Sequence, residues 1–230
     1  MDAEVILDRV HREPPHWAND VILPWDEMKY RQLEPFVKSD YWTDQGSVNI
    51  FRVVGTQHWD YQEKSWVNLL ETGKRMDINL PLHAKKPEYY RQQERKKPMM
   101  YYLTFDGLSF YVGSDGNHRT CIARFDFHYS GLTMLHGVTV NHYQVDWDYW
   151  HLYQKLQDIC RERKIPATVQ AYRESAQRED TAGWKLDHYK TWIKFDDIQQ
   201  AASITLDRKG IEAKIEDLSQ AKKRRFFSFS

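Results

Sequence analysis

The chain has 230 residues, which is enough for one large domain or for one domain with an appendage. Its 33 Lys and Arg residues balance its 33 Asp and Glu residues, which excludes a strongly basic molecule and leaves only local patches for nucleic-acid contacts. The two cysteines lack CxxC spacing, so we expect them to be reduced thiols. No signal pattern opens the sequence and no run approaches the ~18 apolar residues of a membrane helix, so we expect a cytoplasmic protein.

The first hundred residues predict few long elements. Residues 1–23 are polar and interrupted by a pair of prolines, and they predict an irregular arm. Residues 24–34 predict a helix, because proline and acidic residues come first and basic residues later. Residues 47–54 have the composition of a strand. The stretch 73–98 predicts a basic loop, with a helix over 88–97 as an alternative.

The middle of the chain predicts a sheet. Residues 99–105 and 108–112 are strand-like runs on either side of an Asp-Gly pair, which favours a tight hairpin turn. A further strand is expected within 133–145, where apolar residues nearly alternate. Asp146 then caps an amphipathic helix that ends before Pro166.

The last part of the chain, residues 167–230, predicts a helical region that ends in a basic and aromatic tail from Lys222. That tail could contact DNA, a membrane surface or a partner groove, or be a disordered end. The elements together predict an α+β (mixed α/β) fold, with a small mixed sheet flanked by helices. We expect three parts: an arm at 1–23, a domain at 24–166 and the helical region at 167–230.

The most informative segment is the polar turn 113–120, which lies between the strand-like run 108–112 and the helix-like run 121–127. A glycine-bearing turn that opens a helix presents unpaired N–H groups and the positive end of the helix dipole, which together favour an anion. His118 and Arg119 add a switchable donor and a permanent cation at the same place. The alternative is a surface turn that only caps the helix.

Within this turn, Asp115-Gly-Asn-His-Arg119 resembles the signature loop of the ParB/sulfiredoxin superfamily, in which a Gly-x-x-Arg or Gly-Cys-His-Arg segment opens a helix and holds nucleotide phosphates. The resemblance covers about residues 75–145 and implies that superfamily's small mixed sheet. The chain is most similar to plasmid fertility-inhibition proteins of the Osa and FiwA type. This similarity implies that the chain hydrolyses ATP and cleaves DNA (DNase activity). It also implies that the chain blocks the conjugation of a competing element through a type IV secretion system.

Two departures from the superfamily limit what the resemblance implies. The reactive cysteine of sulfiredoxin aligns with Asn117, so peroxiredoxin repair is not expected, and Cys121 is expected to pack into the helix. ParB-type partition proteins carry a DNA-reading helix-turn-helix after the nucleotide domain. No such recognition pattern follows residue 146, so centromere binding is not expected.

The resemblance and the chemistry of the turn assign roles to its residues. The nucleotide-binding residues are expected to be Gly113, Gly116, Asn117, His118, Arg119 and Thr120. Arg119 is expected to fork onto phosphate oxygens and stabilise the transition state, while His118 donates to phosphate or acts as a general acid or base. Asp115 is expected to hold Mg²⁺ or orient the attacking water, or only to cap the turn. Asp115, His118 and Arg119 are thus the candidate catalytic residues, and ATP or another nucleoside triphosphate with Mg²⁺ is the expected ligand.

A basic stretch before the sheet offers a candidate DNA-binding surface. Its cations are Lys85, Lys86, Arg91, Arg95, Lys96 and Lys97, with two tyrosines among them. Such a stretch can follow a nucleic-acid backbone while the rings stack on bases, although a solvated charged face is the commoner arrangement.

Four functions remain open from the sequence. The first is a nucleotide hydrolase with possible metal-dependent DNase activity. The second is a non-enzymatic switch, in which the bound nucleotide changes how the chain binds DNA or a secretion-system partner. The third is a nuclease whose turn holds the scissile phosphate, and the fourth is a domain that only binds a partner protein.

Overall fold

The computed structural model describes residues 3–227, with side chains described over residues 6–220. It confirms the predicted class, since a mixed sheet is flanked by helices and a helix lies at the C-terminal end of the described chain. The chain forms two compact units. Unit 1 comprises the residues up to Asp26, Asp40–Tyr143 and Glu179–Leu186, and unit 2 comprises Glu27–Ser39, Gln144–Arg178 and the residues from Asp187 onward. The predicted division into separate domains, at residues 1–23, 24–166 and 167–230, stays a prediction.

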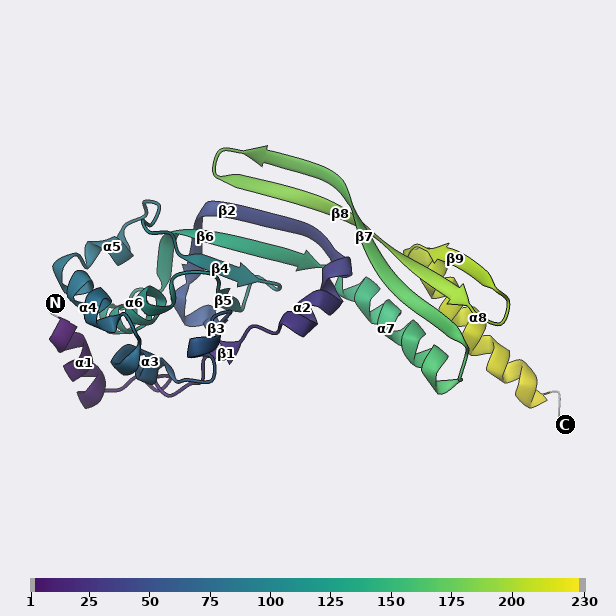
Figure 1. Ribbon diagram of the computed structural model, residues 1–230, viewed down its shortest axis with the longest axis horizontal. Coiled ribbons are helices and arrows are strands. Elements are labelled where there is room, and N and C mark those ends of the chain that lie inside the picture. Colours follow the sequence, from purple (N-terminus) through teal and green to yellow (C-terminus); the bar gives the residue numbers. More distant parts are fainter. Residues whose placement is uncertain (1–2, 228–230) are drawn as a thin grey trace. The chain divides into compact units, whose positions relative to one another are not determined.

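Unit 1 combines strands of a mixed sheet with a group of helices (Figure 1). Its helices are α1 (Ala3–Arg12), α3 (Trp66–Thr72), α4 (Met76–Lys85), α5 (Glu88–Arg91) and α6 (Asn117–Ser130). Its strands are β1 (Leu23–Pro24), β3 (Val53–Thr56), β4 (Tyr101–Thr104), β5 (Phe110–Val112) and most of β2 (Val37–Asn49) and β6 (Met134–Val145). Two short 3-10 helices, η2 (Ile50–Arg52) and η3 (Trp59–Tyr61), connect them. No helix among the described residues has both the length and the apolar composition needed to cross a membrane.

The strands of unit 1 are hydrogen-bonded in the order β1-β3-β5-β4-β6-β2. The predicted hairpin is confirmed, because β4 and β5 pair antiparallel with Tyr102 opposite Val112. Its turn depends on Asp106, whose Oδ1 accepts two backbone N–H groups at 2.8 Å, and on Gly107, which has a φ of +71°. β4 also pairs in parallel with β6, so the chain returns to the sheet through α6.

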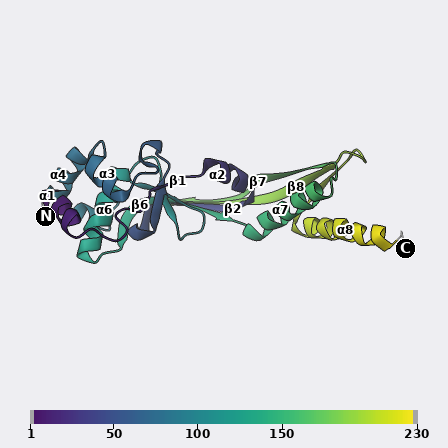
Figure 2. The ribbon, with the colours of Figure 1, turned by 90° about the horizontal axis from the view of Figure 1, so that it is seen from below.

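Helix α6 is the central helix of unit 1, and α1, α3 and α4 gather around it in both views (Figures 1 and 2). Most of its residues from Asn117 to Phe127 are buried, which anchors the start of the helix firmly. The prediction of an irregular arm is wrong, because α1 buries Ile6 and Val10 against the core. These two residues lie four apart and therefore share one face of a helix.

The stretch 73–98, predicted as a basic loop, in fact contains α4 and the short α5. Pro81 lies inside α4, and a proline within a helical pattern usually marks its end. The alternative helix over 88–97 is reduced to the four residues of α5. Helix α4 matters for function because it forms one wall of the cavity described below.

A buried arginine ties α6 to the chain before β3. The guanidinium of Arg124 donates from Nη1 to the carbonyls of Ile50 (3.1 Å) and Val53 (2.9 Å). It lies over the rings of Trp17 and Trp66, with its carbon 4.5 and 4.7 Å from their centroids. Burial lowers the pKa of Arg124 to about 10, so the group still carries its charge at neutral pH.

Unit 2 contains the remaining elements. They are α2 (Glu27–Leu33), the 3-10 helix η1 (Glu34–Phe36), α7 (Trp147–Glu162), β9 (Ala202–Leu206), α8 (Arg208–Phe227) and most of β7 (Ala167–Thr181) and β8 (Trp184–Asp197). α2 and α7 confirm the predicted helices. Asp146 caps α7 as expected, accepting the backbone N–H of Tyr149 at 3.1 Å. Phe36 packs against Tyr149 and Tyr153 of α7.

The prediction of a helical region over residues 167–230 is wrong for its first forty residues, where β7 and β8 are long strands and β9 pairs with β8. Partly buried and exposed residues alternate along the first half of β7, which is the period of a strand. The partly buried positions begin with Ala167, Val169 and Ala171, but from Arg173 onward both faces are largely polar, so hydrophobicity does not reveal the full length of the strand. Only α8 agrees with the helical prediction. The tail side chains from Lys222 to Phe227 lie outside the described side chains, and residues 228–230 lie outside the described residues.

We expect Arg124→Met to lower the free energy of unfolding by about 3 kcal/mol, because two buried carbonyls lose a charged donor. Chemical denaturation followed by circular dichroism measures the loss. Arg52→Met, at an exposed position in the neighbouring 3-10 helix, is the control and should change stability by less than about 0.5 kcal/mol. Equal stability of both variants would contradict the structural role of Arg124.

Candidate functional site

The loop before α6 has the backbone geometry that an anion-binding turn requires. Gly116 is the N-cap of α6 and has a φ of +122°, which a residue with a side chain rarely adopts. No side chain caps this end, and the first backbone N–H bonded within the helix is that of Thr120, which donates to the Gly116 carbonyl at 2.7 Å. The N–H groups of Asn117, His118 and Arg119 therefore remain for a ligand or water.

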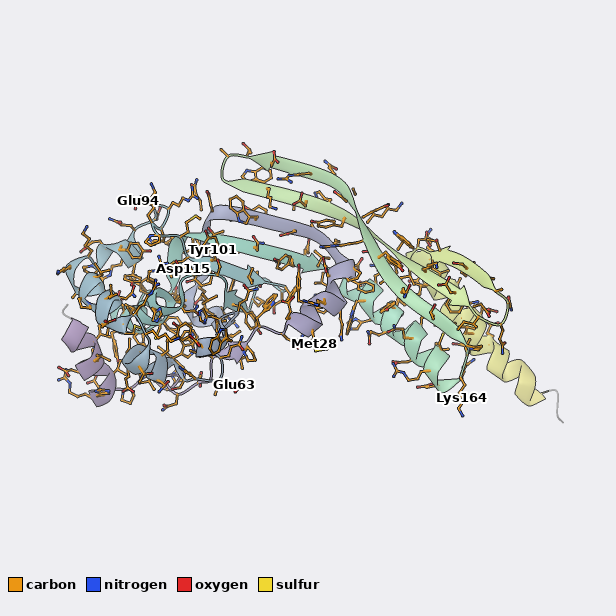
Figure 3. The ribbon with its side chains drawn as sticks, in the orientation of Figure 1. Met28, Glu63, Glu94, Tyr101, Asp115 and Lys164 are labelled. Atoms are coloured by element: carbon orange, nitrogen blue, oxygen red, sulfur yellow. The ribbon has the colours of Figure 1, made fainter. Side chains whose placement is uncertain are left out.

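A cavity of about 280 Å³ opens beside this helix start. It is bounded by α4, by the segment from Lys86 to Pro98 and by the loop at Asp115. Its lining residues are Arg75, Asn79, Leu82, His83, Lys86, Tyr89, Tyr90, Lys97, Pro98, Asp115, Gly116, His118 and Arg119. Asp115 lies beside Tyr101 of β4, whose backbone N–H donates to the Asp115 carbonyl at 3.0 Å (Figure 3). The cavity thus adjoins the end of the central sheet.

Three cations in the cavity wall are available to a ligand. Arg75, Lys86 and Lys97 are exposed, and none of their side chains takes part in an ion pair or hydrogen bond within the described part of the chain. The cavity wall has a single acidic residue, Asp115. The wall therefore carries a net positive charge, which favours an anionic ligand.

Arg119 is a positioning residue in this structure. Its Nη1 donates to the Tyr89 hydroxyl (2.7 Å) and the Pro98 carbonyl (2.5 Å), and its Nη2 to the Met99 carbonyl and Asp115 Oδ2 (both 2.9 Å). These bonds use all four N–H groups of the two terminal nitrogens. The forked contact of Arg119 with phosphate stays a prediction, and it would have to displace protein acceptors.

Asp115 is the candidate catalytic carboxylate that faces the cavity. Its side chain is 56% exposed, and only Oδ2 is bonded to Arg119, so Oδ1 remains for a metal ion or water. Within the described residues, no group of three or more His, Cys, Asp or Glu side chains is arranged to hold a metal. A Mg²⁺ ion here would need oxygens from phosphates and water in addition to Asp115.

His118 lies between the cavity and a second, more open one of about 470 Å³. Its Nε2 contacts the Tyr61 hydroxyl at 3.2 Å and accepts the backbone N–H of Arg75 at 3.4 Å. Burial and the nearby charge of Arg75 lower the pKa of His118 below its ordinary value. Because Nε2 accepts the N–H of Arg75, the proton of the neutral ring lies on Nδ1, and His118 can act as a general base only when Nε2 is released.

The other residues predicted for the turn point in different directions. Asn117 lines the second cavity. Thr120 is buried and its hydroxyl bonds that of Tyr102 at 2.7 Å, so its side chain faces the core. The N–H of Gly113 donates to the Tyr101 carbonyl at 2.7 Å and is already used within the sheet. Of the six residues predicted to bind the nucleotide, Gly116, His118 and Arg119 therefore line the first cavity.

Cys121 packs as predicted. It is fully buried, its thiol donates to the Trp66 carbonyl at 3.3 Å, and burial raises the pKa of the thiol.

The predicted DNA-binding stretch is divided by the fold. Lys96 is 2% exposed and donates to the Gln92 carbonyl at 2.6 Å, and burial lowers its pKa. Arg91 is paired with Asp126, and Arg95 with Asp44 at 2.8 Å. The remaining three cations are exposed, and two of them, Lys86 and Lys97, line the cavity. Half of the six cations thus have partners within the chain, and DNA binding by this stretch stays a prediction.

Sequence reasoning missed one wall of the site. Arg75, Asn79, His83 and Lys86 line the cavity from α4 and its two ends. Their spacing of four, four and three residues is that of one helix face, and this spacing could have predicted the wall from the sequence. Pro81 obscures the pattern, because proline is uncommon inside a helix.

We expect Arg119→Ala to lower the free energy of unfolding by about 3 kcal/mol even without ligand, because four hydrogen bonds of a buried guanidinium are lost. Thermal and chemical denaturation of the free protein measure this loss. Lys97→Gln, an exposed cation of the same cavity, should leave stability nearly unchanged. A stable Arg119→Ala protein would show that the four contacts contribute little.

We expect stability to fall as the pH decreases from about 7.5 to 5. The pKa values of His118, His128 and His142 are lowered in the folded protein, mainly by burial, so the unfolded chain binds these protons more tightly. Stability is therefore lost as the pH falls through the ordinary histidine pKa of ~6.5 toward the folded values. One such group contributes at most about 1.4 kcal/mol per pH unit.

Denaturation midpoints of the wild type and of His118→Gln across this pH range test the expectation. The variant should show a shallower loss, and Lys85→Gln should follow the wild type. Identical slopes for the wild type and His118→Gln would contradict it.

Comparisons of the chain with protein-family models, with curated proteins and with solved structures find no match. Membership of the ParB/sulfiredoxin superfamily therefore stays a prediction, based on the Asp115–Arg119 turn and the elements expected around it. What the site does has to be inferred from its own chemistry.

Proposed function

We propose that the cavity beside α6 binds a nucleoside triphosphate, with ATP as the first candidate, and that the protein hydrolyses it. The observation that carries the proposal is the combination of an uncapped helix start with three unpaired cations, Arg75, Lys86 and Lys97, around one cavity. Free backbone N–H groups and flexible Lys or Arg side chains are two common means by which proteins hold phosphates.

The arrangement suits a chain of phosphates better than a single anion. Arg75 is next to the start of α6, because its backbone N–H reaches His118, while Lys86 lies eleven residues further along the α4 wall. At a helical rise of ~1.5 Å per residue this separation is about 16 Å, so the cations are spread along the cavity.

The cavity also has a surface for the organic part of a nucleotide. Leu82, Tyr89, Tyr90 and Pro98 contribute apolar and aromatic groups to the lining. Ligand sites typically combine such a lining with a few placed polar groups. A site for inorganic phosphate alone would not need these rings.

Hydrolysis requires an activated water, and two groups on the cavity wall can supply it. Asp115 Oδ1 is free to orient water or to hold Mg²⁺ against the phosphates, and the neutral His118 can accept a proton once its Nε2 is released from the backbone N–H of Arg75. The cations would stabilise the charge of the transition state. DNA cleavage and the block of conjugation through a type IV secretion system are part of this proposal on the resemblance alone.

A non-enzymatic switch is the second candidate, and the Arg119 contacts favour it. Arg119 joins Asp115, on the ligand side, to Tyr89 and Pro98 in the exposed segment before β4. A ligand that competes for Asp115 or Arg119 would loosen that segment. Binding without turnover could then change the contacts of the chain with DNA or a partner protein.

We expect wild-type protein to bind ATP in a calorimeter and the double variant Lys86→Gln/Lys97→Gln to bind it at least tenfold more weakly. Each lost charge-assisted phosphate contact costs about 1.5 kcal/mol, and 1.4 kcal/mol corresponds to a factor of ten. Titrations with and without Mg²⁺ measure the change. Lys85→Gln removes an exposed neighbouring cation that does not line the cavity, and it should bind like the wild type.

Phosphate release then separates the two candidates. Steady release of phosphate that is lost in Asp115→Asn supports the hydrolase, whereas tight binding without release supports the switch. Absence of ATP, ADP and CTP binding by a folded wild-type protein would overturn the nucleotide proposal.

A further inference from the structure

Strand β7 has an open edge. It is the last strand in the order of the sheet, and among the described strands its one neighbour is β8. It runs for 15 residues, from Ala167 to Thr181, with no glycine, no proline and no residue of positive φ. Every residue of the strand from Glu174 onward is exposed. The backbone N–H and C=O groups on the open side of such a strand can bond another strand.

The composition of β7 differs from that of a protected edge. Proteins usually protect an open edge with a proline, a bulge, a short strand or lysine side chains. β7 contains neither proline nor lysine, and its charged residues are two arginines, two glutamates and one aspartate. Charges of both signs, in a regular strand of this length, do not repel every partner. They favour a partner strand with the complementary order of charges.

The charges of β7 are complementary to those of a second copy of the same strand. When two copies pair antiparallel about a two-fold axis, directly opposite residues lie on the same face and their numbers have a constant sum. With the axis at Ala176, Glu174 lies opposite Arg178 and Arg173 lies opposite Glu179. Each of these two pairs occurs once on either side of the axis, so opposite charges meet at four places. Such cross-strand pairs stabilise a sheet.

Neighbouring registers of the same pairing lack this match. With the axis at Ser175, no charged residue of β7 lies opposite another charged residue. With the axis at Gln177, Glu174 lies opposite Asp180, and two like charges meet. An axis at Glu174 or at Arg178 places a charge opposite its own copy. The order of the charges therefore selects the register that is centred on Ala176.

The two arginines also have partners within the chain. Arg173 Nη2 bonds Glu34 Oε1 at 2.8 Å, and Arg178 Nε lies 3.7 Å from Asp187 Oδ1. A guanidinium has five N–H donors, so a single carboxylate does not use them all. The side chain of Arg178 is 58% exposed, whereas that of Arg173 is 21% exposed. Arg178 is thus the better placed of the two to reach a second strand.

We propose that β7 is the surface through which two copies of this chain associate, by antiparallel β7–β7 pairing centred on Ala176. The proposal goes beyond the nucleotide-binding function and does not depend on it. A single pair of strands buries little surface, so the dimer is reversible and forms as the protein concentration rises. Its ion pairs are exposed to solvent, so salt weakens it.

The first test is sedimentation velocity of the wild type over a wide range of concentration, at low and at high salt. We expect a shift from monomer to dimer that needs more protein at high salt. Glu174→Arg and Arg178→Glu each place like charges opposite one another at both central pairs, and each should weaken the dimer at least about tenfold. Glu162→Arg makes the same change of charge as Glu174→Arg at an exposed position of α7, and it should dimerise like the wild type.

The second test mixes the two variants. Glu174→Arg has a cation at both central positions and Arg178→Glu has an anion at both, so a mixed dimer regains opposite charges at both pairs. With a fluorescent label on one variant, we expect the mixture to recover the dimer that each variant alone lacks. This recovery also shows that both variants are folded.

Three results would overturn the proposal. A wild type that stays monomeric at every concentration would leave the β7 edge for a strand of another protein. A dimer that both single variants retain at the wild-type strength would place the interface elsewhere. Two monomeric variants that do not associate when mixed would contradict the pairing of Glu174 with Arg178.

Discussion

The candidate site depends on one set of contacts, the four hydrogen bonds of the Arg119 guanidinium. They join the start of α6 to Asp115 on one side and to Tyr89, Pro98 and Met99 on the other. Because α6 is the central helix of unit 1, these contacts also fix the loop at Asp115 and the segment from Tyr89 to Met99 relative to the core. Arg119 thus holds the cavity walls in place, and the N–H groups of its two terminal nitrogens are all bonded to protein acceptors.

The cavity has two kinds of polar group, and the difference has a physical basis. Arg119 is buried and held by four hydrogen bonds, so it is pre-organised before any ligand binds. Arg75 and Lys86 end in solvent and have many conformations. The buried group can therefore select a ligand by geometry, while the exposed cations attract it by charge.

The sequence alone predicted those elements whose local pattern agrees with their packing. The hairpin at the Asp-Gly turn, α6 after its glycine and α7 after Asp146 are examples. It failed where the pattern was masked, as at Pro81 inside α4 and along the polar strand β7. The partners of Arg119 could not be predicted, because Tyr89 lies thirty residues away and is brought near only by tertiary packing.

The exposure of Arg75, Lys86 and Lys97 has a consequence for how the site responds to its surroundings. Solvent-exposed charges are screened when the ionic strength rises, whereas buried hydrogen bonds are affected much less. Salt should therefore weaken the affinity for an anionic ligand and leave the buried hydrogen bonds of Arg119 in place. In such a protein, the ionic conditions set how much ligand is bound, while the buried contacts keep the geometry of the site unchanged.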